Sequence, residues 1–232
     1  MALTDPAEPV GTAHRPSTRL ALRLLLLGVG LSGMAGCWPP PARDLASLAT
    51  ATPLVHLVCD PEADLVVRRS REAYRVRGNT LAELHESMEP HRFRDPSGMA
   101  WDAYTSWEVR WSYPFVREAD SCSLGEAQVL IDLHMQLPRW DPPADADPDL
   151  IGLWGGYIRA LEAHEEGHAQ LALAAACEVQ QALRSLEPQP DCERMELAAD
   201  QVTQTVIDRY HDLEVRYDLE TDHGVADGAM LP

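Results

Sequence analysis

The segment that decides the fold is residues 152–186, which read GLWGGYIRALEAHEEGHAQLALAAACEVQQALRSL. Its apolar residues recur at intervals of three and four, the spacing of one face of an α-helix. This stripe is formed by Tyr157, Leu161, His164, His168, Leu171 and Ala175. We therefore predict one long amphipathic helix whose buried face carries two histidines.

The two histidines belong to an HExxH pattern, HEEGH at 164–168. Residues four apart lie one helical turn apart, so His164 and His168 can face a single ion. Buried imidazoles are costly unless a polar group or a metal satisfies them. The pattern is typical of zinc peptidases, in which zinc lowers the pKa of its bound water to about 7. We predict zinc binding here, with Glu165 as the general base that takes the water's proton.

The segments before this helix predict strands. Residues 105–113 and 127–137 alternate between apolar and polar side chains, as half-buried antiparallel strands do. Residues 54–59 and 72–77 are further strand candidates. Alternating aromatic residues on a strand more often belong to a core than to a cleft, and we assign Trp107 and Trp111 to the core.

Two more helices are expected. Residues 80–88 form a short helix with Asn79 or Thr80 as its cap and Glu83 completing a capping box. Residues 191–219 form a second long helix that begins at Asp191. Strands followed by helices predict an α+β domain of zincin-like arrangement, in which an antiparallel sheet packs against the HExxH helix and a C-terminal helix.

The N-terminus has the pattern of a bacterial export signal. Three arginines up to Arg23 precede an apolar run at 24–29, and Met-Ala-Gly-Cys at 34–37 resembles a lipobox. We expect a signal peptide at 1–36, a lipid on Cys37, a tether at 37–53 and one domain at 54–232. Met34 replaces the usual leucine, so ordinary cleavage or a retained anchor stays open. Trp38 after the cysteine favours the outer membrane of the cell envelope.

Charge and cysteine content narrow the setting further. Without residues 1–36 the chain has 16 basic and 35 acidic groups, a net charge of −19, which argues against a nucleic-acid partner. Four cysteines remain after Cys37, an even number for an oxidising compartment. Because Cys177 and Cys192 flank a short turn, we expect a Cys177–Cys192 disulfide and a Cys59–Cys122 disulfide.

A catalytic zinc needs a third protein ligand and one open position. The sequence offers three candidates: Glu196, which forms an ExxxD pair with Asp200 on the second helix, Asp218, and His223. The Glu196–Asp200 pair also fits a solvated face in an acidic protein, and we favour that interpretation. His56, His134 and His211 have no comparable partners and receive no site role.

Several pieces of the chain resemble a bacterial family, domain of unknown function 922, described as secreted zinc-dependent proteases. They are YRVRGNTLAEL from Tyr74, WDAYTSWEVRWSY from Trp101, LPRW ending at Trp140, HEEGH from His164 and YDLETDHG from Tyr217. The last segment keeps every fixed position of the family's YDxxTxHG pattern.

The resemblance implies that Tyr217, Asp218, Thr221, His223 and Gly224 serve the same site as HEEGH. A histidine after a helix end, followed by a flexible glycine, is suited to reach a metal on the next helix, and we choose His223 as third ligand over Asp218 and Glu196. Tyr217 is a candidate oxyanion donor or only a packing residue. Asp218 or Asp222 is a candidate to orient a liganding imidazole.

We expect a lipid-anchored zinc metallohydrolase that acts on a peptide or protein substrate and reaches the membrane only through its lipid. The alternative is a non-catalytic envelope lipoprotein that keeps a zincin-like scaffold. Glu165 argues against it, since a structural site needs four closed ligands and no such acid. An HExxH pattern that arose by chance predicts no metal at all.

Overall fold

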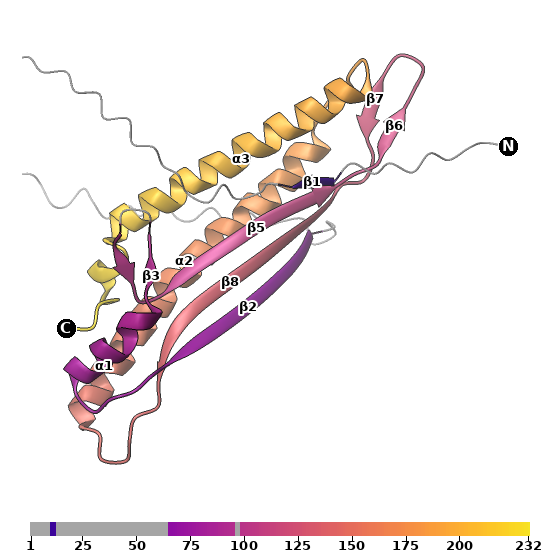
Figure 1. Cartoon of the computed structure of the whole chain (residues 1–232). Helices are drawn as coiled ribbons and strands as arrows, with labels where there is room; N and C mark the ends of the chain where they lie inside the picture. The colour runs from indigo at the N-terminus through magenta and orange to yellow at the C-terminus, as the bar shows by residue number, and fades with distance from the viewer. Residues whose placement is uncertain (1–9, 13–64, 96–97) are drawn as a thin grey trace, which may run out of the picture.

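The computed structural model describes residues 10–12, 65–95 and 98–232. A sheet of long strands is covered on one face by α2 (Pro148–Arg184), and α3 (Cys192–Thr221) packs against α2 (Figure 1). This arrangement confirms the predicted α+β class.

The sheet has the strand order β1-β5-β8-β2. Its strands are β1 (Val10–Thr12), β5 (Tyr104–Ser112), β8 (Gln128–Trp140) and β2 (Leu65–Val76). β5 and β8 run antiparallel, as predicted, with Trp107 opposite Leu133. β2 runs parallel to β8, so the expectation of an antiparallel sheet was wrong for this pair. Parallel neighbours need a long crossover, and residues 77–127, which include α1 and β5, form it.

The core lies between this sheet and α2. The odd-numbered side chains of β5 and of β8 up to Met135 point into it, and Val109, Val129 and Ile131 are at most 1% exposed. α2 presents small residues to them, so that its backbone lies close to the sheet; Ala172, Ala175 and Ala176 are fully buried. Burying each Val or Ile contributes roughly 1.5–3 kcal/mol. Trp107 and Trp111 belong to the same core, as expected.

The two long helices form an antiparallel pair. Asp191 caps α3, as predicted, by accepting a hydrogen bond from the Arg194 N–H at 2.8 Å. Towards the end of α2, Glu178 accepts a hydrogen bond from the Tyr210 hydroxyl of α3 at 3.1 Å. Further along α3 the contacts lie earlier on α2, where Asp218 meets His168. The HExxH turn therefore lies against the last turns of α3.

The predicted short helix is α1 (Leu81–Met88), with Thr80 as its cap and Glu83 completing the capping box. After η2 (Glu89–His91), the strands β3 (Phe93–Arg94) and β4 (Ala100–Trp101) form a small hairpin. A second apolar cluster joins α1 to the first turns of α2 and to the chain end. The hairpin lies beside the end of α3, where Trp101 stacks on His223.

The disulfide prediction is corrected by the structure. Cys122, on the hairpin of β6 (Phe115–Arg117) and β7 (Cys122–Leu124), is bonded to Cys192. This bond excludes both expected pairings, since each contains one of these two cysteines. Cys177 of α2 is buried and is itself disulfide-bonded, whereas Cys192 begins α3 beside β7. The short separation of Cys177 and Cys192 along the chain did not predict the pairing, because Cys192 lies beside β7 and is bonded to Cys122 there.

Several expectations fall outside the described residues: most of the signal peptide 1–36, the lipid site Cys37, the tether 37–53, the strand 54–59, Cys59 and His56. β1 lies within the predicted signal peptide and pairs antiparallel with the end of β5. No helix in the described part of the chain is long and apolar enough to cross a membrane. The last element is η3 (Val225–Asp227).

Candidate metal centre

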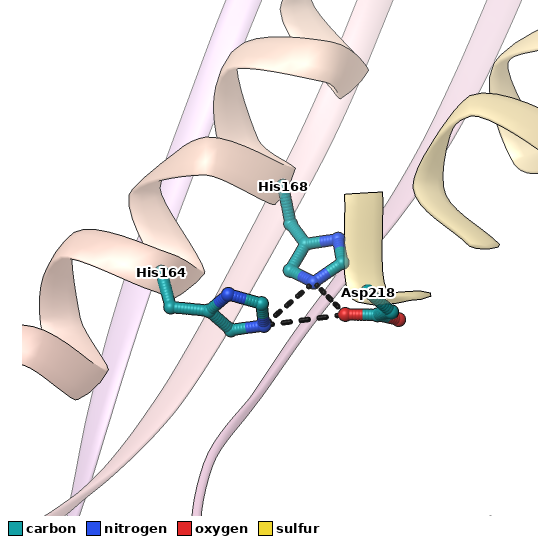
Figure 2. A group of neighbouring side chains, drawn as sticks. All are labelled: His164, His168 and Asp218. Carbon is teal, nitrogen blue, oxygen red and sulfur yellow. Dashed lines mark hydrogen bonds and ion pairs between the residues drawn. The ribbon is translucent and has the colours of Figure 1, made fainter. Parts of the chain in front are cut away.

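Three side chains from two helices converge on one point (Figure 2). The two Nε2 atoms of His164 and His168 lie 3.3 Å apart. Asp218 Oδ1, from α3, lies 3.2 Å from the first and 2.9 Å from the second. These are three atoms with lone pairs at mutual distances of about one hydrogen bond, and they can hold one cation.

The size of this triangle fits a tetrahedral zinc ion. Zinc bonds of about 2.0–2.1 Å at tetrahedral angles place neighbouring ligand atoms about 3.3 Å apart. The observed separations of 2.9 to 3.3 Å are close to that value. Three donors at these separations would occupy one face of such a tetrahedron, and three protein ligands is the number that catalytic zinc sites use.

The outer nitrogens of both histidines have partners that turn the inner nitrogens toward this point. The Thr221 hydroxyl donates to the Tyr217 carbonyl at 2.8 Å, and its oxygen is 3.4 Å from His164 Nδ1. Glu214 Oε1 lies 3.7 Å from His168 Nδ1, a distance that suits an ion pair but exceeds that of a hydrogen bond. Partners of this kind fix the tautomer and orientation of metal-binding imidazoles.

Glu214 was missed in the sequence, although it stands four residues before Asp218 in a second ExxxD pair. The Trp107 indole donates to its Oε1 at 2.7 Å, and His211 Nδ1 lies 3.3 Å from its Oε2. The Glu196 pair considered instead has the same spacing but lies near the start of α3, exposed and close to Tyr113. Spacing alone could not tell the two pairs apart, because only the meeting of α3 with α2 selects one.

His223, the first choice for third ligand, lies outside the triangle. Its Nδ1 is 3.6 Å from Asp218 Oδ1, and its ring stacks on Trp101 with centroids 3.9 Å apart. The structure thus groups Asp218, the second choice, with the two histidines. Asp222 is an exposed residue of left-handed conformation that ends α3.

The general-base candidate Glu165 is buried on the sheet side of α2, only 4% exposed. The Thr105 hydroxyl of β5 donates to its Oε2 at 2.8 Å. Burial raises the pKa of Glu165, while Thr105, His168 and His164 lower it and Asp218 raises it again. The net rise brings the pKa of Glu165 closer to neutral pH. A group that both takes and returns a proton works best when its pKa lies near the working pH. Glu166, the next residue, instead points outward and pairs with Arg69 at 3.3 Å.

The charges of the site favour a bound cation. Burial lowers the pKa of His168, but its contacts with Asp218 and Glu214 dominate and raise it to about 10. For Asp218, burial raises the pKa, but the hydrogen bonds to His164 and His168 bring it well below its usual range. These shifts favour a protonated His168 beside a charged Asp218, so a metal ion bound here would have to displace that proton.

Two glycines allow α3 and its turn to lie directly on the HExxH helix. A Cβ on Gly167 would lie 2.2 Å from the Tyr217 hydroxyl, and one on Gly224 would lie 2.9 Å from His164 Cγ. The Tyr217 ring stacks on His164, and its hydroxyl donates to the His164 carbonyl at 3.3 Å. Tyr217 therefore has the packing role considered from the sequence, with its hydroxyl turned to the helix backbone.

The segment from Trp101 to Trp107 contributes to the site at four positions. Trp101 stacks on His223, Thr105 holds Glu165, and Trp107 holds Glu214. Asp102 fixes the segment by accepting hydrogen bonds from Tyr157 at 2.9 Å and Arg92 at 2.6 Å. The core assignment of Trp107 was correct for its ring but missed the hydrogen bond of its indole nitrogen.

No curated protein and no solved structure matches this chain. A family match, by contrast, extends over residues 71–224, which contain every residue of the site described above. The matching family is described as "Bacterial protein of unknown function (DUF922)". Because the match covers more than half of the sequence, the chain belongs to this bacterial family of unknown function.

Proposed function

We propose that this protein is a zinc-dependent metallohydrolase, and most specifically a peptidase. His164, His168 and Asp218 would hold the ion, with Glu165 as general base. The observation that carries the proposal is the group of three donor atoms beside a buried carboxylate. Three protein ligands would leave one position of a tetrahedral ion for water. A structural zinc site would instead close the fourth position with a further protein ligand.

The ion, when bound, supplies a water of lowered pKa and polarises the carbonyl that is attacked. Glu165 would take a proton from the water as the water's oxygen bonds to the carbonyl carbon, and would return that proton to the nitrogen as the carbon–nitrogen bond breaks. Thr105 keeps the carboxylate turned toward the site by its hydrogen bond. Burial helps, because a carboxyl of raised pKa returns its proton readily.

An extended peptide fits the surroundings of this site. β8 covers one edge of β5 along its whole length. On the other edge the described residues provide only β1, which pairs with Arg110 to Ser112 and leaves Tyr104 to Val109 without a strand partner. Since Thr105 lies in that open stretch, a substrate strand added there would run past Glu165. This placement favours peptide bonds over other amides.

The cellular setting is proposed from the N-terminal sequence. The lipobox ending at Cys37 supports a lipid-anchored protein of the bacterial cell envelope, in the outer membrane, with the lipid as its membrane contact. A net charge of −18 supports protein or peptide partners rather than nucleic acid.

The test compares two adjacent substitutions in HEEGH. Glu165→Gln should keep zinc, measured by elemental analysis, and lose at least about 100-fold in kcat on a peptide library, the usual range for removing a general base. Glu166→Gln, which changes only an exposed pair with Arg69, should retain activity. Zinc without hydrolysis in the wild-type protein would point to the non-catalytic envelope lipoprotein. Absence of zinc would leave the HExxH pattern as a coincidence.

A further inference from the structure

His223 is held beside the candidate metal centre without joining it. Its Nδ1 is 3.6 Å from Asp218 Oδ1, too far for a hydrogen bond. Within the described residues, Nε2 of His223 has no hydrogen-bond partner. The side chain is 34% exposed, so a bound molecule can reach it.

The turn that carries His223 is fixed by its backbone. Asp222, His223 and Gly224 adopt consecutive left-handed conformations, with φ of 50°, 52° and 79°. Non-glycine residues rarely adopt this region, and such outliers gather at functional sites. The His223 N–H donates to the Asp218 carbonyl at 2.8 Å, and the Gly224 N–H donates to Thr221 Oγ1 at 3.2 Å. Gly224 itself lies against His164. The turn is thus tied to the site at each residue.

The ring of His223 is fixed by Trp101, whose plane lies 27° from it at a centroid distance of 3.9 Å. Trp101 is held in turn, because its indole donates to Asp95 Oδ2 at 3.3 Å and the next residue, Asp102, is bonded to Arg92.

We infer that His223 is a catalytic residue that donates a hydrogen bond from Nε2 to the substrate's carbonyl oxygen as negative charge develops on it. The other donor considered for this task, Tyr217, gives its hydroxyl to the His164 carbonyl. Donors placed in advance for a developing oxyanion are among the largest contributors to catalysis. This role rests on the proposed function, because it needs a hydrolytic reaction at His164, His168 and Asp218.

The experiment separates a donor from a ligand with two variants of the zinc-loaded full chain. His223→Phe keeps a ring on Trp101 but removes the donor, and His223→Gln keeps an N–H near the Nε2 position. The probe is the phosphinic analogue of the best-cleaved library peptide, whose tetrahedral oxygens imitate the transition state. We expect His223→Phe to keep zinc and to lose about 100- to 1000-fold in both kcat and affinity for this analogue. His223→Gln should stay within about 10-fold of wild type in both quantities.

His91→Phe is the matched control, since His91 is an exposed histidine that stacks on Tyr74 at 4.9 Å and contacts no residue of the metal triangle. If His223→Phe does not fold, His223→Asn replaces it, because asparagine tolerates the left-handed backbone and ends short of Nε2. Loss of zinc in the folded variant would make His223 a ligand, and unchanged analogue affinity would remove its role; either overturns the inference alone. A wild-type protein that hydrolyses nothing overturns the proposed function as well.

Discussion

At the scale of single residues, steric space explains why the HEEGH sequence has a glycine at position 167. Gly167 lies in the middle of α2, where glycine costs up to about 1 kcal/mol relative to alanine. The Tyr217 hydroxyl occupies the space that a side chain would need, 2.2 Å from an added Cβ. The pattern therefore encodes the approach of α3 as well as the two histidines of the candidate metal centre.

Gly167→Ala should lower the free energy of unfolding by about 1–3 kcal/mol, because Tyr217 must shift to make room. Gly156→Ala is the matched control on the same helix, since a Cβ there meets no atom within 4 Å. It should raise the free energy of unfolding by up to about 1 kcal/mol. Urea unfolding of the metal-free protein measures both. Equal stabilisation by the two substitutions would contradict the close approach of Tyr217.

Glu214 acts through His168 and not on substrate. Because it holds the Nδ1 side of the imidazole, Glu214→Gln should weaken zinc binding by about 10- to 100-fold, measured by competition with a chelator. The cobalt-substituted variant should also show an altered visible spectrum, which a change in stability alone would not produce. Glu220→Gln is the control, an exposed glutamate on the same helix that pairs with Arg216. Equal zinc affinity in the two variants would dismiss the positioning role.

At the scale of elements, the sequence was informative wherever the signal is local. Thr80 with Glu83, and Asp191, lie at the helix starts that their capping chemistry predicts. The alternation in 105–113 and 127–137 predicted β5 and β8 within a few residues. The direction of β2 and the partner of Cys192 were wrong, because each depends on a crossover that local periodicity does not describe. The choice of third ligand was open for the same reason.

The antiparallel helix pair is also joined away from the site, by Glu178 of α2. Arg209 and Tyr210 of α3 both contact this carboxylate. The hydrogen bond from Arg209 lowers the pKa of Glu178, against a smaller rise from burial. A carboxyl whose pKa is depressed by folding adds stability above its ordinary value and loses it as the pH falls through the folded value.

Glu178→Gln should therefore destabilise the protein at pH 7 by less than about 1 kcal/mol, since both side chains are partly exposed. The difference from wild type should vanish as the pH is lowered below the depressed pKa, where the wild-type carboxyl is also neutral. Urea unfolding of both proteins at pH 7 and at acid pH measures this difference. The same destabilisation at both values would show that the side chain acts by packing and not by charge.

At the scale of the whole molecule, the site exists only where four distant segments meet. α2 supplies the histidines and Glu165, the end of α3 supplies Asp218 and Glu214, β5 supplies Thr105, and the hairpin supplies Trp101 (Figure 1). An unfolded chain keeps the two histidines and Glu165 near one another but separates them from Asp218, which lies 50 residues beyond His168. A metal ion held by all three ligands should therefore bind the folded state far better than the unfolded one.

This difference predicts that zinc stabilises the fold. At a free zinc concentration of 100 times Kd, the free energy of unfolding should rise by about 2.7 kcal/mol, and a chelator should reverse the gain. Asp218→Asn should abolish most of the gain, because it removes the only triangle donor from α3 and leaves two that already share one helix. His223→Phe should keep the gain in full. Thermal unfolding of the three proteins, each with zinc and with chelator, decides between them. A gain that survives in Asp218→Asn but is lost in His223→Phe would restore His223 as the third ligand, because only a ligand couples the ion to the folded arrangement of the two helices.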